Sequence, residues 1–515
     1  MNYRAIVHVI SLLLIFLSLG MASAGAVSQL QHDASSCSKI FFFCAGVTLA
    51  AALLGLLFAR RRRGEREYKT GVREGFAAVA FSWLLASLFG ALPFYCLADM
   101  TPADAIFETA SGLTTTGASV IAETLTLNNG QLLSGGLESL PHGLLYWRCM
   151  LNWFGGVGIV FFVLLILPLM NYGKGNQLYN AEVPGLKTDS EQLTPRLLSS
   201  VRLILGVYLL LTFLATAVYW LGGMEVFDAL CHAFATVSTG GFSTKAKSIG
   251  HYQSAFLQWS VIFFMFISAC NFSLIVKMFI TRKFLFFADE EFRFFAYLTC
   301  GASVLVALFL YAHCPAGIPG LNGTIPRSTE AFLRTAFFQV TSLISTTGFA
   351  TSDYMQWGVT PVLLILWCII FPCGCGGSTS GGIKCSRLIV IFKQVHSEIK
   401  RCLFSRTLSD VRLSGNRIEQ SLVHKTMAFV LLYLLVFLGV GVALTFLVQA
   451  DLQTALGAAL ACLSNVGPGF GAVGPAGHYA WLNAPAKYLL VFTMIAGRLE
   501  LYTVLVLFLP AFWKR

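Results

Sequence analysis

Long apolar runs alternate with short polar connections along almost the whole of this 515-residue chain. Many of the runs reach 18 residues, which is long enough for one α-helix to cross the hydrocarbon core of a bilayer. Two such runs lead the chain, and four longer units follow, each with a short apolar segment between two long ones. These short segments predict half-membrane helices that enter the bilayer and return: residues 103–113, 227–237, 332–344 and 453–463.

The first apolar run permits two interpretations. Residues 1–26 have the basic start, apolar centre and small-residue end of a secretory signal peptide. The same residues would equally suit an uncleaved first helix, ahead of a second helix over about residues 40–58. Both interpretations put residues 27–38 outside the cytoplasm, so the predicted topology is the same in either case.

The positive charges predict which connections face the cytoplasm. Residues 60–73 contain seven Lys and Arg residues, and residues 384–425 contain nine. Basic connections stay in the cytoplasm by the positive-inside rule. Two further basic connections and the basic C-terminus share that side: 174–202, 277–293 and 514–515. The four connections between them hold at most two Lys or Arg residues each and are predicted to face outward: 99–142, 223–258, 312–356 and 451–486.

Each outward connection contains a related polar turn directly after its half-membrane helix. The four turns read LTTTGAS (113–119), STGGFST (238–244), ISTTGFAT (344–351) and SNVGPGFGAVGP (464–475). They align on Gly117, Gly241, Gly348 and Gly467. In every turn a hydroxyl residue stands three positions before that glycine, an aliphatic residue four before it and Ala twelve before it. The chain therefore repeats one unit four times.

Four equivalent turns in one chain predict a shared axial site. Backbone outside a helix is tolerated at membrane depth only where protein buries it or water solvates it. Glycine can adopt positive φ, so successive carbonyl groups can point to one side, and rings of carbonyl oxygens replace the hydration shell of a permeating cation. The alternative is a set of turns used only for tight helix packing. Four turns in register, on the side with few basic residues, favour the cation path.

Composition narrows the class of protein further. The chain is 56% hydrophobic and 11% charged, against about 25% charged in soluble domains, which predicts an all-α integral membrane protein. The net charge of +11 follows the topology signals, so we expect no nucleic-acid partner. The outward turns carry almost no His, Asp or Glu, so we predict no catalytic residue and no covalently bound cofactor. Cys373, Cys375 and Cys385 lie among Gly and Ser, which favours close packing over a metal site.

These turns resemble those of the bacterial Trk/Ktr potassium-uptake family. The two extra N-terminal helices and the segment GGSTSGGIK (376–384) are most similar to its TrkH-type membrane subunits. The resemblance implies potassium as the transported ion, bound by the residues just before and at each turn glycine. The potassium-binding residues so implied, and the only metal ligands expected, are Thr115, Thr116, Gly117, Thr239, Gly240, Gly241, Thr346, Thr347, Gly348, Asn465, Val466 and Gly467. Since Asn465 and Val466 replace the Thr-Thr of the first and third turns, we expect an asymmetric pore.

A glycine-rich segment, residues 374–384, interrupts the helix predicted over residues 357–399. Glycine at this density prevents a stable helix. One interpretation is a kinked, closely packed helix. The resemblance favours the other, an intramembrane gate loop below the four turns. Flexibility would then come from three glycines and a charge near the cytoplasmic end from one lysine: Gly377, Gly381, Gly382 and Lys384.

Arg498 stands inside the apolar run 486–513, where a charge costs about 2.5–3.5 kcal/mol on insertion scales. Glu500 is a poor partner, because residues i and i+2 lie on different faces of a helix. We therefore expect Arg498 to face the pore or the gate loop, where its charge would repel cations or tether the loop.

The predicted architecture is four pseudo-symmetric helix–pore loop–helix repeats around a central pore, plus two N-terminal transmembrane helices. Those helices and their basic link occupy residues 1–74, and the repeats are 75–198, 199–292, 293–421 with the gate loop 374–384, and 422–515. The resemblance implies a multi-pass protein of the bacterial inner membrane with its pore loops on the periplasmic side. It also implies a homodimer and a cytosolic TrkA-type nucleotide-binding regulator, for which residues 384–425 would be the docking surface.

Three functions are compatible with this architecture. The first is a gated potassium channel, and the second is a sodium- or proton-coupled potassium symporter. A proton-coupled carrier needs a titratable residue along the path, and a sodium-coupled carrier needs a second cation site. The sequence identifies neither, so the choice between these two stays open at this point. The third function, a membrane-embedded enzyme, is disfavoured by the scarcity of ionisable groups.

Overall fold

The computed structural model describes residues 1–60, 71–166, 197–283, 285–404 and 411–513. In this part helices are the dominant regular structure, and strands are few and short. Six of its helices are long and apolar enough to cross a membrane, or up to eight spans if each of two bent pairs is one span. The predicted all-α membrane fold is confirmed.

Four sets of helices follow the leading pair, α1 (Tyr3–Leu30) and α2 (Ser35–Phe58). The first set is α3 (Val72–Gly90), α4 (Leu92–Ala98), α5 (Pro102–Leu113) and α6 (His142–Ile166), and the second is α8 (Leu197–Leu221), α9 (Val226–Val237), α10 (Ala255–Ser268) and α11 (Phe272–Thr281). The third set is α12 (Glu290–His313), α13 (Thr329–Ile344), α14 (Thr360–Ile369) and α15 (Cys385–Leu403). The fourth is α16 (Gln420–Val448), α17 (Leu452–Leu463), α18 (Ala484–Arg498), α19 (Leu501–Leu505) and α20 (Pro510–Trp513). The short helices α5, α9, α13 and α17 stand where the half-membrane segments were predicted.

Short strands occur in three pairs. β1 (Ile318–Gly320) and β2 (Gly323–Ile325) pair antiparallel, as do β5 (Arg412–Leu413) and β6 (Asn416–Arg417). β3 (Pro372–Cys373) and β4 (Ile383–Lys384) pair parallel and join the two ends of the glycine-rich segment. Six 3-10 turns complete the elements: Gly136–Ser139, Ser248–His251, Phe286–Ala288, Tyr354–Gln356, Gly471–Val473 and Val506–Phe508.

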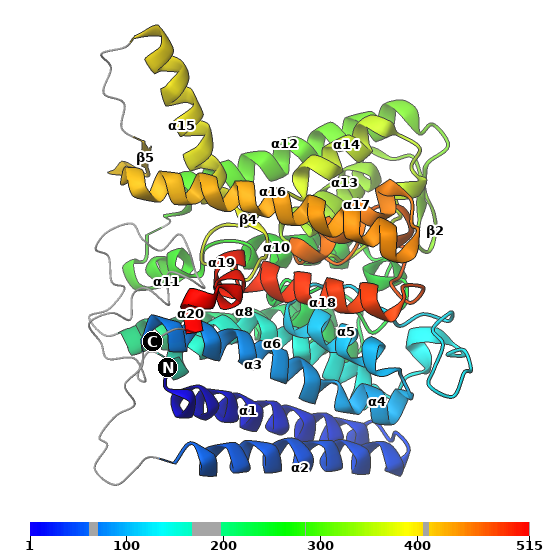
Figure 1. Ribbon diagram of the computed structural model, residues 1–515. Coiled ribbons are helices and arrows are strands. Elements are labelled where there is room, and N and C mark those ends of the chain that lie inside the picture. The colour runs from blue at the N-terminus through cyan, green and yellow to red at the C-terminus, as the bar shows by residue number, and fades with distance from the viewer. Residues whose placement is uncertain (61–70, 167–196, 284, 405–410, 514–515) are drawn as a thin grey trace.

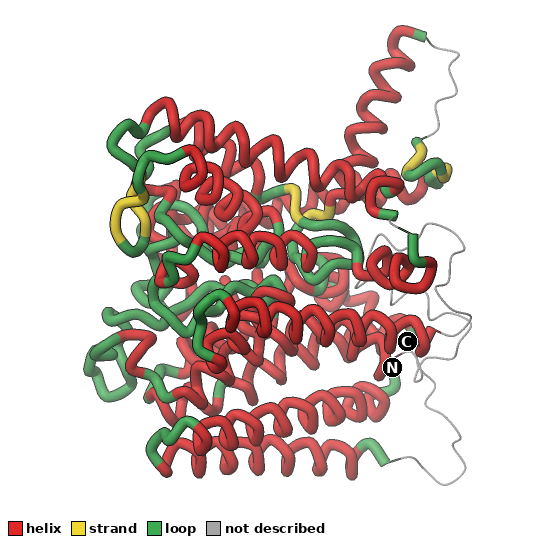
Figure 2. The backbone as a smooth tube through the Cα atoms, turned by 180° about the vertical axis from the view of Figure 1, so that it is seen from behind, coloured by secondary structure: helices red, strands yellow, loops and turns green. Residues whose placement is uncertain are grey.

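The bundle has two distinct sides. Both chain termini lie on the same side as α11 and β5, and β2 lies on the opposite side (Figure 1). The view from behind shows the same division, with most helices running between the two sides (Figure 2). The described parts of the basic connections 277–293 and 384–425 thus lie on the side of the termini. Of the predicted basic connections, residues 61–70, 167–196 and 405–410 are outside the described residues.

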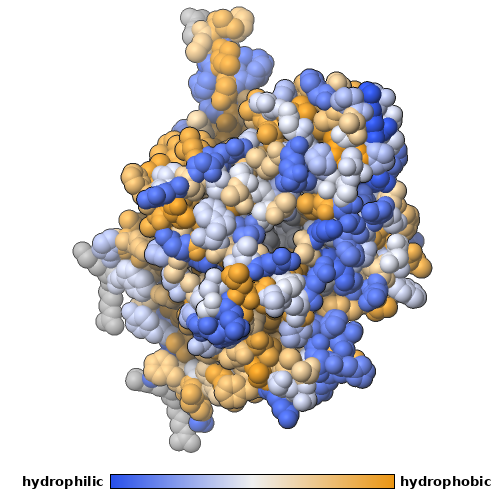
Figure 3. Space-filling view, turned by 90° about the vertical axis from the view of Figure 1, so that its right-hand side faces the viewer, coloured by the Kyte–Doolittle hydropathy of each residue, from blue (hydrophilic) through white to orange (hydrophobic). Residues whose placement is uncertain are grey.

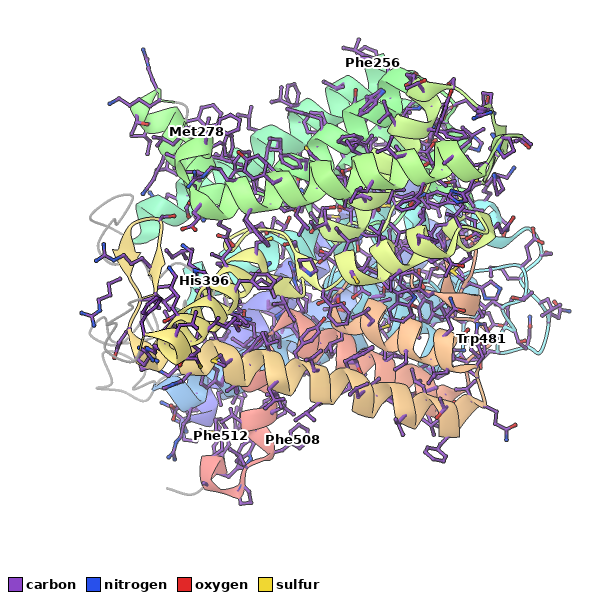
Figure 4. All side chains as sticks on the ribbon, turned by 90° about the horizontal axis from the view of Figure 1, so that it is seen from above. Phe256, Met278, His396, Trp481, Phe508 and Phe512 are labelled. Atoms are coloured by element: carbon purple, nitrogen blue, oxygen red, sulfur yellow. The ribbon has the colours of Figure 1, made fainter. Side chains whose placement is uncertain are left out.

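Apolar side chains cover the exterior of the bundle. Phe256 and Phe508 project from opposite edges (Figure 4) and are 58% and 69% exposed. Phe446 on α16 is 82% exposed. A bilayer explains an apolar exterior of this kind, which soluble monomers rarely present. The interior combines large aromatic side chains such as Trp147 with small residues such as Ala459 on α17, both fully buried.

The second long helix is interrupted in three of the four sets. α10 and α11 meet at 92°, and α18 meets α19 and the following 3-10 turn at 118°. α14 and α15 are separated by the glycine-rich segment. The sequence predicted only the interruption between α14 and α15. The breaks between α10 and α11 and between α18 and α19 were not predicted.

Candidate functional site

The four short helices end in the same backbone conformation. The second residue after each helix has positive φ: Thr115 (53°), Thr239 (55°), Thr346 (59°) and Asn465 (57°). In the first turn, the amides of Thr115 and Thr116 donate to the carbonyls of Gly112 and Ser111 at 3.0 and 2.9 Å. The same pair of hydrogen bonds forms in the other three turns. Each helix therefore ends in a Schellman cap.

Three of these left-handed positions hold threonine, which is unusual. A β-branched residue at positive φ is a genuine outlier, and left-handed backbone costs an L-residue about 1–2 kcal/mol. Such strain concentrates at functional sites. Two of the three threonine hydroxyls reach the glycine-rich segment: Thr346 Oγ1 accepts from the Gly381 amide at 2.9 Å, and Thr239 Oγ1 donates to Thr379 Oγ1 at 3.3 Å.

The four glycines close the turns into a ring. Gly117, Gly241, Gly348 and Gly467 have φ of 78°, 72°, 79° and 91°. A methyl group on any of them would overlap a carbonyl oxygen of the next turn in the chain. The oxygens concerned belong, in order, to Gly240, Thr347, Val466 and Thr116. Because the fourth contact returns to the first turn, the ring is closed, and it brings the twelve sequence-predicted ion-binding residues together. We call these twelve residues the turn ring.

The turn ring opens toward the outer side of the molecule. Gly117, Gly241 and Gly348 are partly exposed, whereas the threonines of the ring are fully buried. Figure 3 views the molecule from the side that carries β2 and shows a hollow near the middle of that face. The ring residues are Thr, Gly, Asn and Val, so the polar atoms available to a cation are uncharged oxygens. Oxygens of this kind can replace the water around a monovalent cation.

A buried ion pair supports the ring between its first and second turns. Arg148 on α6 and Glu108 on α5 are 5% and 0% exposed, and Arg148 Nε donates to Glu108 Oε1 at 2.5 Å. Glu108 also accepts from Ser119 Oγ and the Val120 amide, each at 3.0 Å. Arg148 Nη1 donates to the Ser243 carbonyl at 2.8 Å. Glu108 thus anchors the first turn, and Arg148 ties it to the second.

The glycine-rich segment, residues 374–384, packs against the inner side of the ring. Thr379 Oγ1 donates to the carbonyls of Val237 and Ser268 at 3.1 and 3.2 Å. A side chain at Gly381 would overlap the Ser464 carbonyl. Gly377 and Gly382 have φ of 74° and 59°, which is the conformation that favours glycine. The segment therefore contacts the ends of the second, third and fourth short helices.

Arg498 binds this segment from α18, and Lys384, its last residue, forms hydrogen bonds within it. Arg498 is 5% exposed and donates to the Thr379 carbonyl at 2.6 Å and to the Gly155 carbonyl of α6 at 3.0 Å. Lys384 Nζ donates to the carbonyl of Ser380, and to its hydroxyl at 3.0 Å. Glu500 pairs with Arg387 at 2.7 Å. Arg498 therefore occupies the second of the two places expected for it, at the glycine-rich segment.

Sequence reasoning missed two residues that hold these parts. Glu291 at the start of α12 accepts from the Gly376 and Ser386 amides, each at 2.8 Å, so one carboxylate ties both ends of the glycine-rich segment. Tyr479 donates its hydroxyl to the Gly467 carbonyl at 2.8 Å. Neither residue belongs to the repeated turns, so the repeat alignment carried no signal for them.

The fold and the turn ring define a helical membrane protein whose pore-like site suits a cation. The chain belongs to the TrkH family of cation transport proteins, whose sequence model matches residues 39–515. It is a transport protein and not an enzyme.

Several relatives match over their whole length or nearly so. The Trk system potassium uptake proteins TrkH of Salmonella typhimurium and of Escherichia coli are 35% identical to it, and each match covers 100% of both chains. TrkG of Escherichia coli is 33% identical, over 100% of this chain and 99% of TrkG. The crystal structure of the potassium transporter TrkH from Vibrio parahaemolyticus is similar with a TM-score of 0.84, 31% identity and full coverage of both chains.

Proposed function

We propose that this chain carries K⁺ across the bacterial inner membrane as the conducting subunit of a Trk-type uptake system. The observation that carries the proposal is the closed turn ring, in which a methyl group on any of four glycines would overlap the neighbouring turn. In this proposal the four helix sets are pseudo-symmetric repeats around one pore. K⁺ is the proposed ion because the similar TrkH and TrkG proteins are named potassium uptake proteins.

The twelve residues of the turn ring would form the ion site. Backbone carbonyls of the ring are the proposed ligands, because several ring threonines direct their hydroxyls to other groups. Thr116 Oγ1, for instance, lies 2.7 Å from Thr114 Oγ1, and Thr347 Oγ1 lies 2.7 Å from Ser345 Oγ. Potassium would arrive from the periplasm through the outer hollow, past connections with few basic residues to repel it.

The glycine-rich segment would act as the gate. Its bonds to Thr346 and Thr239 hold it against the ring, and an ion leaving the ring inward has to pass it. Gly377, Gly381 and Gly382 would allow the segment to move. Arg498 and Lys384 would hold the closed state through the carbonyls of Thr379 and Ser380.

We propose gated conduction in preference to proton-coupled symport. The turn ring itself contains no titratable side chain, and a coupled proton would need one on the ion path. We also propose that a cytosolic nucleotide-binding regulator of the TrkA type controls the gate and that the subunit works as a homodimer. α15 supports a cytoplasmic docking surface, because it leaves the bundle (Figure 1) and exposes Phe392 and Ile399 by 60% and 57%.

Ion flux into proteoliposomes tests the proposal. The wild type should take up K⁺ in preference to Na⁺, and uptake should persist when a protonophore collapses the proton gradient. Gly348→Ala should lose uptake, because the new methyl group overlaps the Val466 carbonyl. Gly358→Ala is the matched control: Gly358 also has positive φ, at 68°, but a methyl group there meets nothing within 4 Å. Uptake in Gly348→Ala equal to that in the control would refute the pore.

A further inference from the structure

The fourth turn differs from the other three in the environment of its glycine carbonyl. The Gly467 carbonyl accepts a hydrogen bond from the Tyr479 hydroxyl at 2.8 Å. Within the described part of the chain, the carbonyls of Gly117, Gly241 and Gly348 accept no hydrogen bond. Those three carbonyls are therefore free to face an ion, whereas the fourth is already bound to the protein wall.

Solvent exposure shows the same difference. Gly117, Gly241 and Gly348 are partly exposed, but Gly467 is buried, and Pro468 is the partly exposed residue of the fourth turn. The fourth glycine is thus withdrawn from the surface that the other three present. Its φ of 91° is also the largest of the four.

Tyr479 is itself held firmly by the first repeat. It is 3% exposed, and its amide donates to the Ser119 carbonyl at 2.9 Å. Its ring lies against Phe107 on α5, with 5.4 Å between the ring centres. Ser119 is in turn bound to Glu108. The hydroxyl therefore acts from a fixed position, and its bond keeps the Gly467 oxygen directed toward the wall.

We propose that Tyr479 determines the ion specificity of the turn ring by withholding the Gly467 carbonyl from the ion. This inference rests on the proposed potassium pathway and assigns to Tyr479 the role of a positioning residue. With the bond in place, the glycine level of the ring offers three carbonyl ligands instead of four. Discrimination of K⁺ from Na⁺ depends on the number and strength of such dipoles. The native ring should therefore discriminate K⁺ from Na⁺ less strongly than a ring with four free carbonyls at this level.

Tyr354 provides a matched control, because it makes the same kind of bond beside the ring. Its hydroxyl donates to the Gly469 carbonyl at 2.6 Å, and the residue is fully buried. Gly469 lies two residues beyond Gly467 and outside the turn ring. Removing this hydroxyl disturbs the fourth turn to a similar degree without changing a carbonyl of the glycine level.

The experiment compares K⁺/Na⁺ permeability ratios from reversal potentials of the purified chain in planar bilayers. Tyr479→Phe should raise the ratio about two- to tenfold, the range that one hydrogen bond corresponds to, and Tyr354→Phe should leave it at the wild-type value. Tyr479→Met also removes the hydroxyl donor and should likewise raise the K⁺/Na⁺ permeability ratio. It replaces Tyr479→Phe in the test if the phenylalanine variant does not assemble.

Each other outcome has a distinct meaning. An unchanged or lowered ratio in both Tyr479 variants, or an equal rise in Tyr354→Phe, overturns the role of Tyr479 while leaving the pathway intact. A wild type without K⁺-selective current overturns the proposed function itself. The two failures are therefore distinguishable in one series of recordings.

Discussion

At the scale of single residues, the strained threonines of the turns are the most informative feature. Glycine would fit the left-handed position without strain, yet three turns hold threonine there. The hydroxyl of Thr346 explains the choice in the third turn, because it binds the Gly381 amide of the glycine-rich segment. Strain in the backbone thus accompanies a contact that only a side chain can make.

Thr346→Val tests this contact directly. Valine keeps the branched shape but cannot accept the Gly381 hydrogen bond, so the gate should leave the ring more often. We expect K⁺ uptake without a regulator to rise about two- to tenfold, as the loss of one hydrogen bond allows. Thr346→Ser retains the hydroxyl and should behave as the wild type. Equal uptake by the valine and serine variants would contradict the interpretation.

The pair formed by Glu108 and Arg148 should be costly to break. Arg148→Met leaves a carboxylate buried without its partner, which costs about 3–5 kcal/mol, although Ser119 and Val120 still donate to it. The thermal unfolding midpoint in detergent should fall accordingly. The double variant Glu108→Gln with Arg148→Met removes both charges and should recover most of the loss. A double variant as unstable as the single one would show that packing of Arg148, not charge, is decisive.

At the scale of elements, local pattern predicted the helices well and their breaks poorly. The segment predicted over 453–463 is a helix over Leu452–Leu463, because apolar length and flanking polar residues specify it. The break between α10 and α11 has another origin. There the Ala269 carbonyl accepts from the Cys375 amide at 2.9 Å, and the Phe272 amide donates to the Gly377 carbonyl at 3.2 Å. Bonds to a segment about a hundred residues away replace those of the helix, and no local pattern reveals them.

The break between α18 and α19 follows the same principle. Arg498 at the end of α18 binds the Thr379 carbonyl, and Glu500, with φ of 61°, binds Arg387. The sequence located the four turns from their repetition, the family resemblance selected the twelve residues within them, and Arg498 was singled out by its charge in an apolar run. It could not identify Tyr479 or Glu291, since a single tyrosine or a helix-start glutamate is common and its role depends on distant partners.

Glu291 should hold the whole glycine-rich segment in the position that closes the proposed path. Glu291→Ala removes the acceptor for the Gly376 and Ser386 amides, so both ends of the segment lose their anchor. We expect higher regulator-independent K⁺ uptake and faster proteolysis within residues 374–384. Glu290→Ala is the control, because Glu290 on the same turn pairs with Lys393 and the Ser414 amide outside the gate. Wild-type uptake in Glu291→Ala would show that the gate is held elsewhere.

At the scale of the whole molecule, contacts outside the turn ring also join the four helix sets. On the outer side, Arg148 reaches the second turn, the Gly250 amide donates to the Ala350 carbonyl of the third at 3.0 Å, and Tyr354 binds the fourth. Lys487 of the fourth set closes the circle through an ion pair with Asp104 on α5 at 2.5 Å. Neighbouring helix sets are therefore tied pairwise, and the turn ring is the place where all four meet.

An ion in the turn ring should therefore stabilise the entire fold. A ligand that binds only the native state adds about 2.7 kcal/mol of stability at a hundred times its Kd. Because the ring draws its oxygens from all four helix sets, K⁺ should raise the unfolding midpoint of the whole bundle, and more than Na⁺ or choline at equal ionic strength. Gly348→Ala should lose this K⁺ dependence while Gly358→Ala keeps it. If K⁺ and choline stabilise the wild type equally, the ion does not bind where all four repeats meet.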